Sequence, residues 1–277
     1  MTVEPDREAV CAALGQESRR VARLVRGCAR LDAPVPGLAW TTGQVAVHLS
    51  VIYRIFAATL RGEPFGAELA DAGSTLAQAT AAANALALEV FTPGAPAEAA
   101  GELEAGAAEL GAAVASCPDL RAACPAPWYG PEVTVTAGAL AAIGVSETLV
   151  HGHDLGRAVG GGQRLPAGPA TAVAATVMSA MMPLLLDPAQ AGGFTGGFDI
   201  RVRGGQRFVL RVADGKAWAE PPGGQRADCV VWVSGRTALL TGMGRQPLWR
   251  AVLTGGIVAF GRRPWIAPRL RTMFPPP

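Results

Sequence analysis

Residues 146–155 read SETLVHGHDL and hold two of the three histidines of the chain. Glu147 and His151 are four residues apart, and Asp154 is seven residues from Glu147. On a helix, positions i, i+4 and i+7 share one face. That face would carry two carboxylates and an imidazole among Ala, Gly, Leu and Val, where an unpartnered charge is costly to bury. A divalent metal ion is a partner that would satisfy these groups.

The third histidine, His48, lies about a hundred residues earlier in AWTTGQVAVHLS, residues 39–50. Thr41 followed by Gln44 fits a capping box, so we expect a helix to begin just after Thr41 and to end near Gly62. His48 is then two turns into this helix, next to an apolar stripe. It is the obvious third ligand for a metal bound by Glu147 and His151.

Two imidazoles and one carboxylate suit zinc or another divalent transition metal. Three protein ligands leave one coordination position open, which is the catalytic rather than the structural pattern. Asp154 is placed to orient the His151 ring through its second nitrogen. The alternative is that Glu147 and His151 form an i, i+4 polar pair on a solvated face, and that His48 is a hydrogen-bonded core residue.

The composition limits the class of protein to which this chain can belong. Half of the 277 residues are hydrophobic and 17% are charged, as in a globular protein. A net charge of +2 gives no argument for a nucleic-acid partner. The five cysteines are scattered and form no CxxC pair, so neither a disulfide framework nor a thiolate zinc site is indicated. With no signal-like segment at the start, we expect a cytoplasmic protein.

No membrane partner is expected either. The most apolar run, residues 170–186, falls short of the ~20 apolar residues that cross a bilayer, and we interpret it as a buried helix.

Residues 1–165 are expected to form an all-α four-helix bundle with one long internal connection. The periodicity predicts helices over residues 5–31, 42–62 and 136–159, and one between 74 and 116 that is interrupted near 92–96. Gly160, Gly161 and Gly162 suit a left-handed cap at the end of the last helix. A connecting helix then fills residues 166–192.

After Gly192 the pattern changes to short runs that alternate apolar and polar residues. We expect residues 193–277 to form a separate α+β domain with an antiparallel sheet. Asp214-Gly215 is a hairpin signal, and a last strand is expected at 256–260.

The segment 117–131 contains four prolines, so it cannot be a regular helix. Trp128 and Tyr129 lie between those prolines, shortly before the 136–159 helix. The two aromatic side chains either line a site or hold the loop against the bundle. We take them as candidate contacts for a cofactor.

The motifs TTGQVAVHLS (41–50) and SETLVHGHDLGRAVG (146–160) together resemble the N-terminal domain of the mycothiol-dependent maleylpyruvate isomerase family, a DinB-like bundle. By motif, the three metal ligands of that family fall on His48, Glu147 and His151. This chain departs from the family at His153, where a Trp is usual. His153 lies about 120° round the helix from Glu147, so it is not expected to be a ligand, but it is a candidate acid or base.

The C-terminal residues 193–277, with LLTGMGRQPLW at 239–249, resemble the sterol-carrier-like domain found behind this bundle. The resemblance implies a thiol cosubstrate, mycothiol in actinobacteria, bound as thiolate at zinc or another divalent metal. In an isomerase the thiolate adds to an electron-poor alkene, the bond rotates, and elimination returns the thiol. In an S-transferase the thiolate stays attached to the electrophile.

The resemblance also implies a small-molecule substrate such as an unsaturated keto acid, and therefore an arginine facing the metal. Arg245 is the candidate, with Arg157 on the 136–159 helix as a further cofactor contact, and with Arg236 and Arg262 as competitors. The protein is expected to be a monomer or homodimer. Two alternatives stay open: a metal bundle repurposed for thiol-independent biosynthetic chemistry, and a non-catalytic carrier of an apolar ligand.

Overall fold

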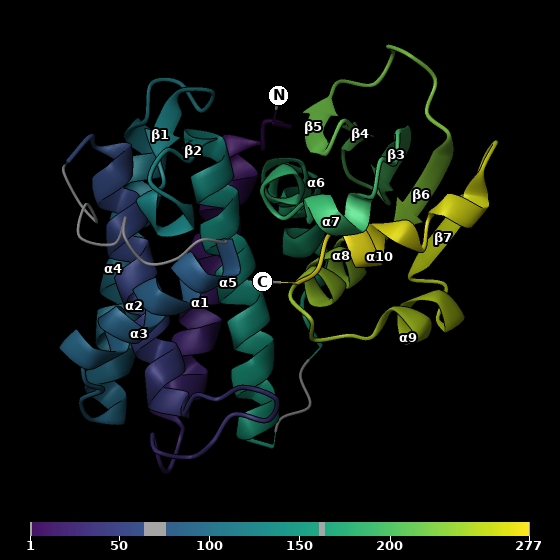
Figure 1. Ribbon diagram of the computed structural model, residues 1–277. Coiled ribbons are helices and arrows are strands. Elements are labelled where there is room, and N and C mark those ends of the chain that lie inside the picture. Colours follow the sequence, from purple (N-terminus) through teal and green to yellow (C-terminus); the bar gives the residue numbers. More distant parts are fainter. Residues whose placement is uncertain (1, 64–75, 161–163, 277) are drawn as a thin grey trace. The chain divides into compact units, whose positions relative to one another are not determined.

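The computed structural model describes residues 2–63, 76–160 and 164–276 (Figure 1). The chain divides into two compact units, Asp6–Pro169 and Ala170–Pro277, and the second also includes Met1–Pro5. The first unit is helical, and the second is built on a five-stranded sheet with short helices. The fold class is therefore the expected one, an N-terminal helical bundle followed by an α+β domain.

Four long helices pack against one another in the first unit, each of them contacting at least two of the others. They are α1 (Arg7–Arg26), α2 (Thr42–Leu60), α4 (Pro96–Ser116) and α5 (Ala137–Ala158). The helix expected between 74 and 116 is two helices, because α3 (Leu76–Val90) is separate from α4. The break falls at the predicted Pro-Gly-Ala-Pro stretch, where Pro96 begins α4.

Caps fix the ends of both histidine-bearing helices, and those at Thr41 and Gly160 were predicted from the sequence. Thr41 Oγ1 accepts from the Gln44 N–H at 3.3 Å, and Gln44 Oε1 accepts from the Thr41 N–H at 2.8 Å, which completes the capping box of α2. Thr136 caps α5 with a single bond, as its Oγ1 accepts from the Ala139 N–H at 3.2 Å. Gly160 has φ +75° just after α5, as expected for a left-handed cap, while Gly161 and Gly162 lie outside the described residues.

The proline-rich segment between α4 and α5 forms a small hairpin. Its strands are β1 (Ala123–Pro125) and β2 (Thr134–Thr136), paired antiparallel, with the single 3₁₀ turn η2 (Pro127–Tyr129) between them. The expectation that this segment is not a regular helix is confirmed. The hairpin presents η2 to α3, and the Trp128 ring lies 5.4 Å from that of Phe56 on α2.

The sheet of the second unit has the strand order β5-β4-β3-β6-β7. The strands are β3 (Gly196–Val202), β4 (Arg207–Ala213), β5 (Lys216–Glu220), β6 (Cys229–Val233) and β7 (Ile257–Phe260). The expected antiparallel pairing holds for three of the four strand pairs of this sheet, whereas β3 and β6 pair in parallel. Alternating hydrophobicity predicts that a strand exists but says nothing of its direction, and here residues 221–228 carry the chain back across the sheet.

The predicted hairpin at Asp214-Gly215 is confirmed. Ala213 pairs with Lys216, so β4 and β5 are joined by a two-residue turn. Both turn residues have positive φ, +50° at Asp214 and +69° at Gly215. These are the angles of a type I′ turn, which Asp and Gly tolerate better than other residues.

The long helix α6 (Ala167–Leu184) begins at the boundary between the units. Short elements complete the second unit, namely α7 (Pro188–Ala191), α8 (Gly235–Gly242), α9 (Leu248–Leu253), the 3₁₀ turn η3 (Pro264–Ile266) and α10 (Arg269–Met273). A cavity of about 660 Å³ lies in this unit, with walls from α6, the sheet and the C-terminal helices. Its lining is largely apolar and includes Met178, Met182 and Ile200.

Two helices, α2 and α6, are long and apolar enough to cross a membrane by length and composition alone. The apolar window of α2 is 78% buried, because this helix is central to the bundle. That of α6 is only 33% buried, which corrects our interpretation of residues 170–186 as a buried helix. One reason is that Met178, Met182 and Leu185 line the cavity of the second unit rather than a close-packed core.

Helices α1 and α5 approach closely at Gly152, in the middle of the VHGHDL stretch. A Cβ atom placed on Gly152 would lie 2.7 Å from Val21 Cγ2 and 2.5 Å from Arg20 Nη2. Val21 is fully buried and has little freedom to move. The glycine between His151 and His153 is thus required by the packing of the two helices.

We expect Gly152→Ala to lower the free energy of unfolding by about 1–3 kcal/mol, because the added methyl group overpacks the α1–α5 contact. Gly101→Ala on α4 is the matched control, since a Cβ there meets nothing within 4 Å. That substitution should stabilise the bundle by up to about 1 kcal/mol through helix propensity. Urea unfolding followed by helical circular dichroism measures both, and equal effects would contradict the packing argument.

Candidate metal centre

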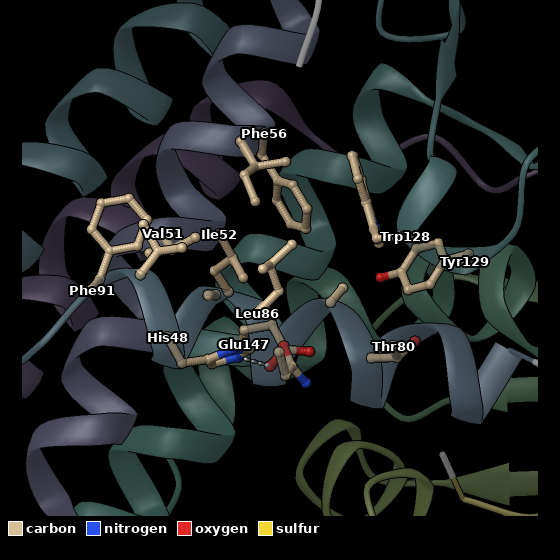
Figure 2. Close-up of a pocket in the computed structure, with 15 residues that line it drawn as sticks. His48, Val51, Ile52, Phe56, Thr80, Leu86, Phe91, Trp128, Tyr129 and Glu147 are labelled. Atoms are coloured by element: carbon tan, nitrogen blue, oxygen red, sulfur yellow. Dashed lines mark hydrogen bonds and ion pairs between the residues drawn. The ribbon is translucent and has the colours of Figure 1, made fainter. Parts of the chain in front are cut away.

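Three side chains from α2 and α5 converge inside the bundle. Glu147 Oε2 lies 3.5 Å from His48 Nε2 and 3.3 Å from His151 Nε2, and Figure 2 shows His48 and Glu147 side by side at the base of a cavity. One possible ligand atom from each residue lies within 4.8 Å of the others. The His48 and His151 side chains are almost fully buried, whereas the Glu147 side chain is 18% exposed.

Local sequence explains how these groups meet. The Thr41 capping box fixes the start of α2, and the i, i+4 spacing puts Glu147 and His151 on one face of α5. A buried hydrogen bond also joins the two helices, as Tyr53 Oη lies 2.5 Å from Thr148 Oγ1. Thr148 donates its own proton to the Gly144 carbonyl, so the tyrosine is the donor of the bond between the helices.

The three ionisable groups shift one another's pKa. Burial acts to raise the pKa of Glu147, but hydrogen bonds from His151 and His48 outweigh it, and the pKa lies well below its ordinary value. Burial lowers the pKa of His48, and the bond to Glu147 opposes this only in part. Burial also acts to lower the pKa of His151, but the Asp154 and Glu147 carboxylates raise it above its ordinary value. The site therefore holds an ionised carboxylate between its imidazoles.

Two further residues contact the imidazoles. Asp154, which is fully buried, has Oδ2 3.3 Å from His151 Nδ1. A proton on Nδ1 would face this carboxylate, which would leave the lone pair of His151 Nε2 available to a metal ion when one is bound. The Trp40 ring lies 4.9 Å from the His48 ring and 5.8 Å from the His151 ring, so it packs against both.

The donor set fits a divalent transition metal. In a tetrahedral site with bonds of about 2.1 Å, ligand atoms lie about 3.4 Å apart, and the two Glu147–histidine distances of 3.5 and 3.3 Å match this. Three donors leave a further position, and Glu147, the most exposed of the three, faces the cavity. A metal ion held by His48, Glu147 and His151 would therefore present its open side to the cavity.

The cavity has a volume of about 260 Å³ and is bounded by α2, α3, η2 and α5 (Figure 2). Its wall is mostly apolar and includes Ile52, Phe56, Leu86, Phe91 and Trp128. Polar groups on the wall are few. Among them is Tyr129, whose hydroxyl points toward the cavity (Figure 2). Burial raises the pKa of this phenol above its ordinary value, and the Glu147 carboxylate raises it further, so the hydroxyl stays protonated at neutral pH.

Trp128 and Tyr129 are thus both on the cavity wall, and Trp128 also holds the hairpin to α2 through Phe56. The alternatives for this segment were that its aromatic side chains line a site or that they hold the loop against the bundle, and the structure shows both. His153 is half-buried, and it neither lines the cavity nor belongs to the ligand cluster. Arg157 is exposed in the last turn of α5 and does not line the cavity.

The remaining arginine candidates belong to the second unit. Arg245 follows α8, and its guanidinium donates to the Met243 carbonyl at 2.7 Å. Arg236 lies in the first turn of α8, and Arg262 pairs with Asp228 at 2.5 Å. These contacts lie within the second unit, which is described by itself.

Three residues at this site were missed by sequence reasoning. Trp40 could have been found, because it stands in the same motif as His48. Asn84 and Thr80 on α3 carry no recognisable signal, since that helix is rich in alanine and its inward face is set by packing. Asn84 forms a hydrogen bond with His48 that acts to raise the pKa of the imidazole, and Thr80 lines the cavity.

A helical bundle with a His–Glu–His cluster beside an apolar cavity defines a candidate metal-binding enzyme domain. Residues 14–156 match the model of the mycothiol maleylpyruvate isomerase N-terminal domain. The match covers half of the chain, and the protein belongs to this family. The resemblance seen in its motifs is thereby confirmed.

Solved structures show weaker likenesses. A mycothiol-dependent maleylpyruvate isomerase is 14% identical, with a TM-score of 0.48 over 92% of each chain, and a mutant of it is 13% identical with the same score and coverage. The sec-alkylsulfatase Pisa1 from Pseudomonas sp. is 15% identical, with a TM-score of 0.31 over 50% of this chain and 24% of its own. No curated protein sequence matches this chain.

The Tyr53–Thr148 bond gives an asymmetric prediction. Tyr53→Phe should cost about 0.5–1.5 kcal/mol of stability, because Thr148 keeps its bond to Gly144. Thr148→Val should cost more, about 1–3 kcal/mol, because it leaves the fully buried Tyr53 hydroxyl without that partner. Chemical unfolding of the two variants under the same conditions measures which of them loses more stability. A larger loss for Tyr53→Phe would contradict this prediction.

Proposed function

We propose that this protein is an enzyme that uses a divalent metal ion, with zinc as the candidate, and a low-molecular-weight thiol. The reaction is cis–trans isomerisation of a small electrophile, or S-transfer to it. The observation that carries the proposal is the convergence of His48, Glu147 and His151 at one end of an apolar cavity. Membership of a family named for mycothiol and for isomerisation supports the choice of thiol and reaction.

His48, Glu147 and His151 would hold the metal. When bound, such an ion lowers the pKa of a coordinated thiol, so that the sulfur is available as thiolate at neutral pH. The protein contributes a preformed carboxylate, since the low pKa of Glu147 keeps it ionised. It also contributes an oriented imidazole, since Asp154 lies against the far nitrogen of His151.

The cavity wall contributes the remaining features of the proposed active site. Trp40 packs against both imidazole rings and limits their rotation. Apolar side chains on the wall displace part of the water around the site, which strengthens electrostatic interactions there. The protonated Tyr129 hydroxyl can donate a hydrogen bond to a carbonyl oxygen of the substrate, and Trp128 offers a flat apolar surface.

For the other site residues, the support differs. Trp128 and Tyr129 remain our proposed contacts for the thiol, because they line the cavity. Arg157 and His153 do not line it and so have no comparable support, while Arg245, in the second unit, stays a proposed catalytic residue. We further propose a cytoplasmic protein, a monomer or homodimer, that acts on small molecules and has no nucleic-acid or membrane partner.

Metal content is the first test. Protein purified without chelator should contain about one zinc or other divalent ion per chain, because three ligands of suitable type converge. His48→Ala and His151→Ala should each reduce this content to near zero. His153→Ala is the matched control and should retain the metal, since its ring lies outside the cluster. Elemental analysis decides, and wild-type protein without stoichiometric metal would refute the site.

Turnover is the second test. A panel of cis-alkenes and other electrophiles should be converted only when both the metal and mycothiol are present. Removal of the metal with a chelator should abolish conversion, and re-addition should restore it. Turnover that needs the metal but not the thiol would instead support the repurposed bundle.

The carrier alternative has its own observation, the cavity of about 660 Å³ in the second unit. Its walls are apolar, as a lipid or hydrophobic metabolite would require. A co-purified apolar ligand that survives chelator treatment, together with no turnover of the electrophile panel, would favour this function over the enzyme.

A further inference from the structure

The turn η2 holds a tyrosine hydroxyl group inside the cavity beside the candidate metal centre. Tyr129 lines this cavity, and Figure 2 shows its hydroxyl group directed into the space that Glu147 and His48 also line. All three residues belong to the unit Asp6–Pro169, so their arrangement is set within one compact body.

Hydrogen bonds of the hairpin fix the backbone on either side of Tyr129. The Tyr129 N–H donates to the Ala126 carbonyl at 2.9 Å, and the Ala126 N–H donates across the hairpin to the Val133 carbonyl at 2.8 Å. The Gly130 N–H donates to the Pro127 carbonyl at 3.0 Å. Gly130 has φ +141°, which glycine adopts readily, so the chain can turn directly after the tyrosine. Tyr129 is therefore presented from a braced turn rather than from a free loop.

The neighbouring tryptophan restrains the tyrosine ring. Trp128 is buried, and its ring lies 5.4 Å from that of Phe56 on α2. On its other side the Trp128 ring lies 5.8 Å from the Tyr129 ring, at an interplanar angle of 65°. This is one of the arrangements that aromatic pairs prefer. The hydroxyl oxygen is thus held in place, as stabilisation of a developing charge requires.

The hydroxyl group is also suited to donate a hydrogen bond. Burial raises the pKa of Tyr129, and the Glu147 carboxylate raises it further, so the oxygen keeps its proton at neutral pH. Asn84, another polar residue of the wall, already bonds with His48. Thr80 supplies a second hydroxyl group on the wall, buried and without a hydrogen-bond partner among the described residues. Such groups mark positions where a ligand oxygen can bond.

Addition of a thiolate to an alkene that is conjugated to a carbonyl group creates charge on an oxygen atom. The sulfur forms a bond to the β carbon, and the electron pair of the double bond moves to the carbonyl oxygen as an enolate. The former double bond is then single and can rotate. Return of the electron pair and departure of the thiolate give the trans alkene, with no net gain or loss of a proton. A donor at that oxygen binds the enolate more strongly than the ground-state carbonyl, so it lowers the barrier.

We propose that the Tyr129 hydroxyl group is a catalytic hydrogen-bond donor to the carbonyl oxygen of a conjugated electrophile. This inference rests on the proposed function and deepens it. The ring of Tyr129 stays our proposed contact for the thiol, whereas its hydroxyl group acts on the electrophile. When a thiolate instead displaces a halide, the charge leaves with the halide, and the hydroxyl group has no part in that reaction.

The chain has only two tyrosines, which gives a matched pair of variants. Tyr129→Phe removes the hydroxyl group in the cavity, and Tyr53→Phe removes one that is buried between α2 and α5 and does not line the cavity. With zinc-loaded protein and mycothiol, Tyr129→Phe should lower kcat for dimethyl maleate by about 10- to 100-fold, after subtraction of the uncatalysed rate. KM should stay within about threefold, since the lost bond is made mainly in the transition state.

Tyr53→Phe should keep kcat within about threefold of the wild-type value, and both variants should keep their metal. A kcat for Tyr129→Phe within about threefold of the wild-type value would overturn the inference. Benzyl chloride, which reacts by displacement, gives the internal comparison. Its conversion by Tyr129→Phe should stay within about threefold of the wild-type rate. Equal losses on the two electrophiles would indicate a general disturbance of the cavity and would also overturn the inference.

A binding measurement needs no turnover. The dye dimethylaminocinnamaldehyde absorbs at longer wavelength when its carbonyl oxygen accepts a hydrogen bond. Added to zinc-loaded protein without thiol, it should shift to longer wavelength in the wild type and in Tyr53→Phe, and clearly less in Tyr129→Phe. Equal shifts in all three proteins would overturn the inference. If the wild type converts neither electrophile in a metal- and thiol-dependent way, the proposed function fails, whereas the dye still reports whether Tyr129 donates to a carbonyl oxygen.

Discussion

A carboxylate held between two buried imidazoles is the constraint on which the first unit depends. Glu147 can remain ionised inside the bundle only because His48 and His151 lie within 3.5 Å of it. Those partners come from helices about a hundred residues apart, so α2 and α5 must keep both their register and their separation. The capping box on α2, the Tyr53–Thr148 bond and the close approach at Gly152 each fix one part of that geometry.

Exposure orders the three groups in a chemically useful way. The imidazoles are 4% and 7% exposed and are backed by Asp154 and Trp40, whereas the Glu147 side chain is 18% exposed and lines the cavity. The rigid part of the cluster thus lies toward the core and the accessible part toward the ligand space. A reactive group bound there would have protein on one side and an apolar-lined cavity on the other.

Local signals allowed much of this to be predicted from the sequence. Thr41 and Gln44 gave the start of α2, Asp214-Gly215 gave a hairpin, and i, i+4 spacing put Glu147 beside His151, because each depends on residues close in the chain. The long-range pair of His48 with Glu147 was accessible only because the chain has so few histidines. The parallel pairing of β3 with β6 and the α3 wall of the cavity depend on tertiary packing, which leaves no local pattern. The arginine expected at the metal came from a likeness to relatives rather than from residues around the site.

The division of labour between helices has an evolutionary consequence. Every group proposed to hold the metal comes from α2 and α5. Helix α3, which is not one of the four main helices, supplies wall residues such as Thr80, Leu86 and Val90. Substitutions on α3 other than at Asn84, which bonds to His48, can therefore alter what enters the cavity without disturbing the reactive centre. Divergence confined to a short alanine-rich segment is a simple route by which one inherited chemistry could be passed to new molecules, and paralogues would be expected to differ there first.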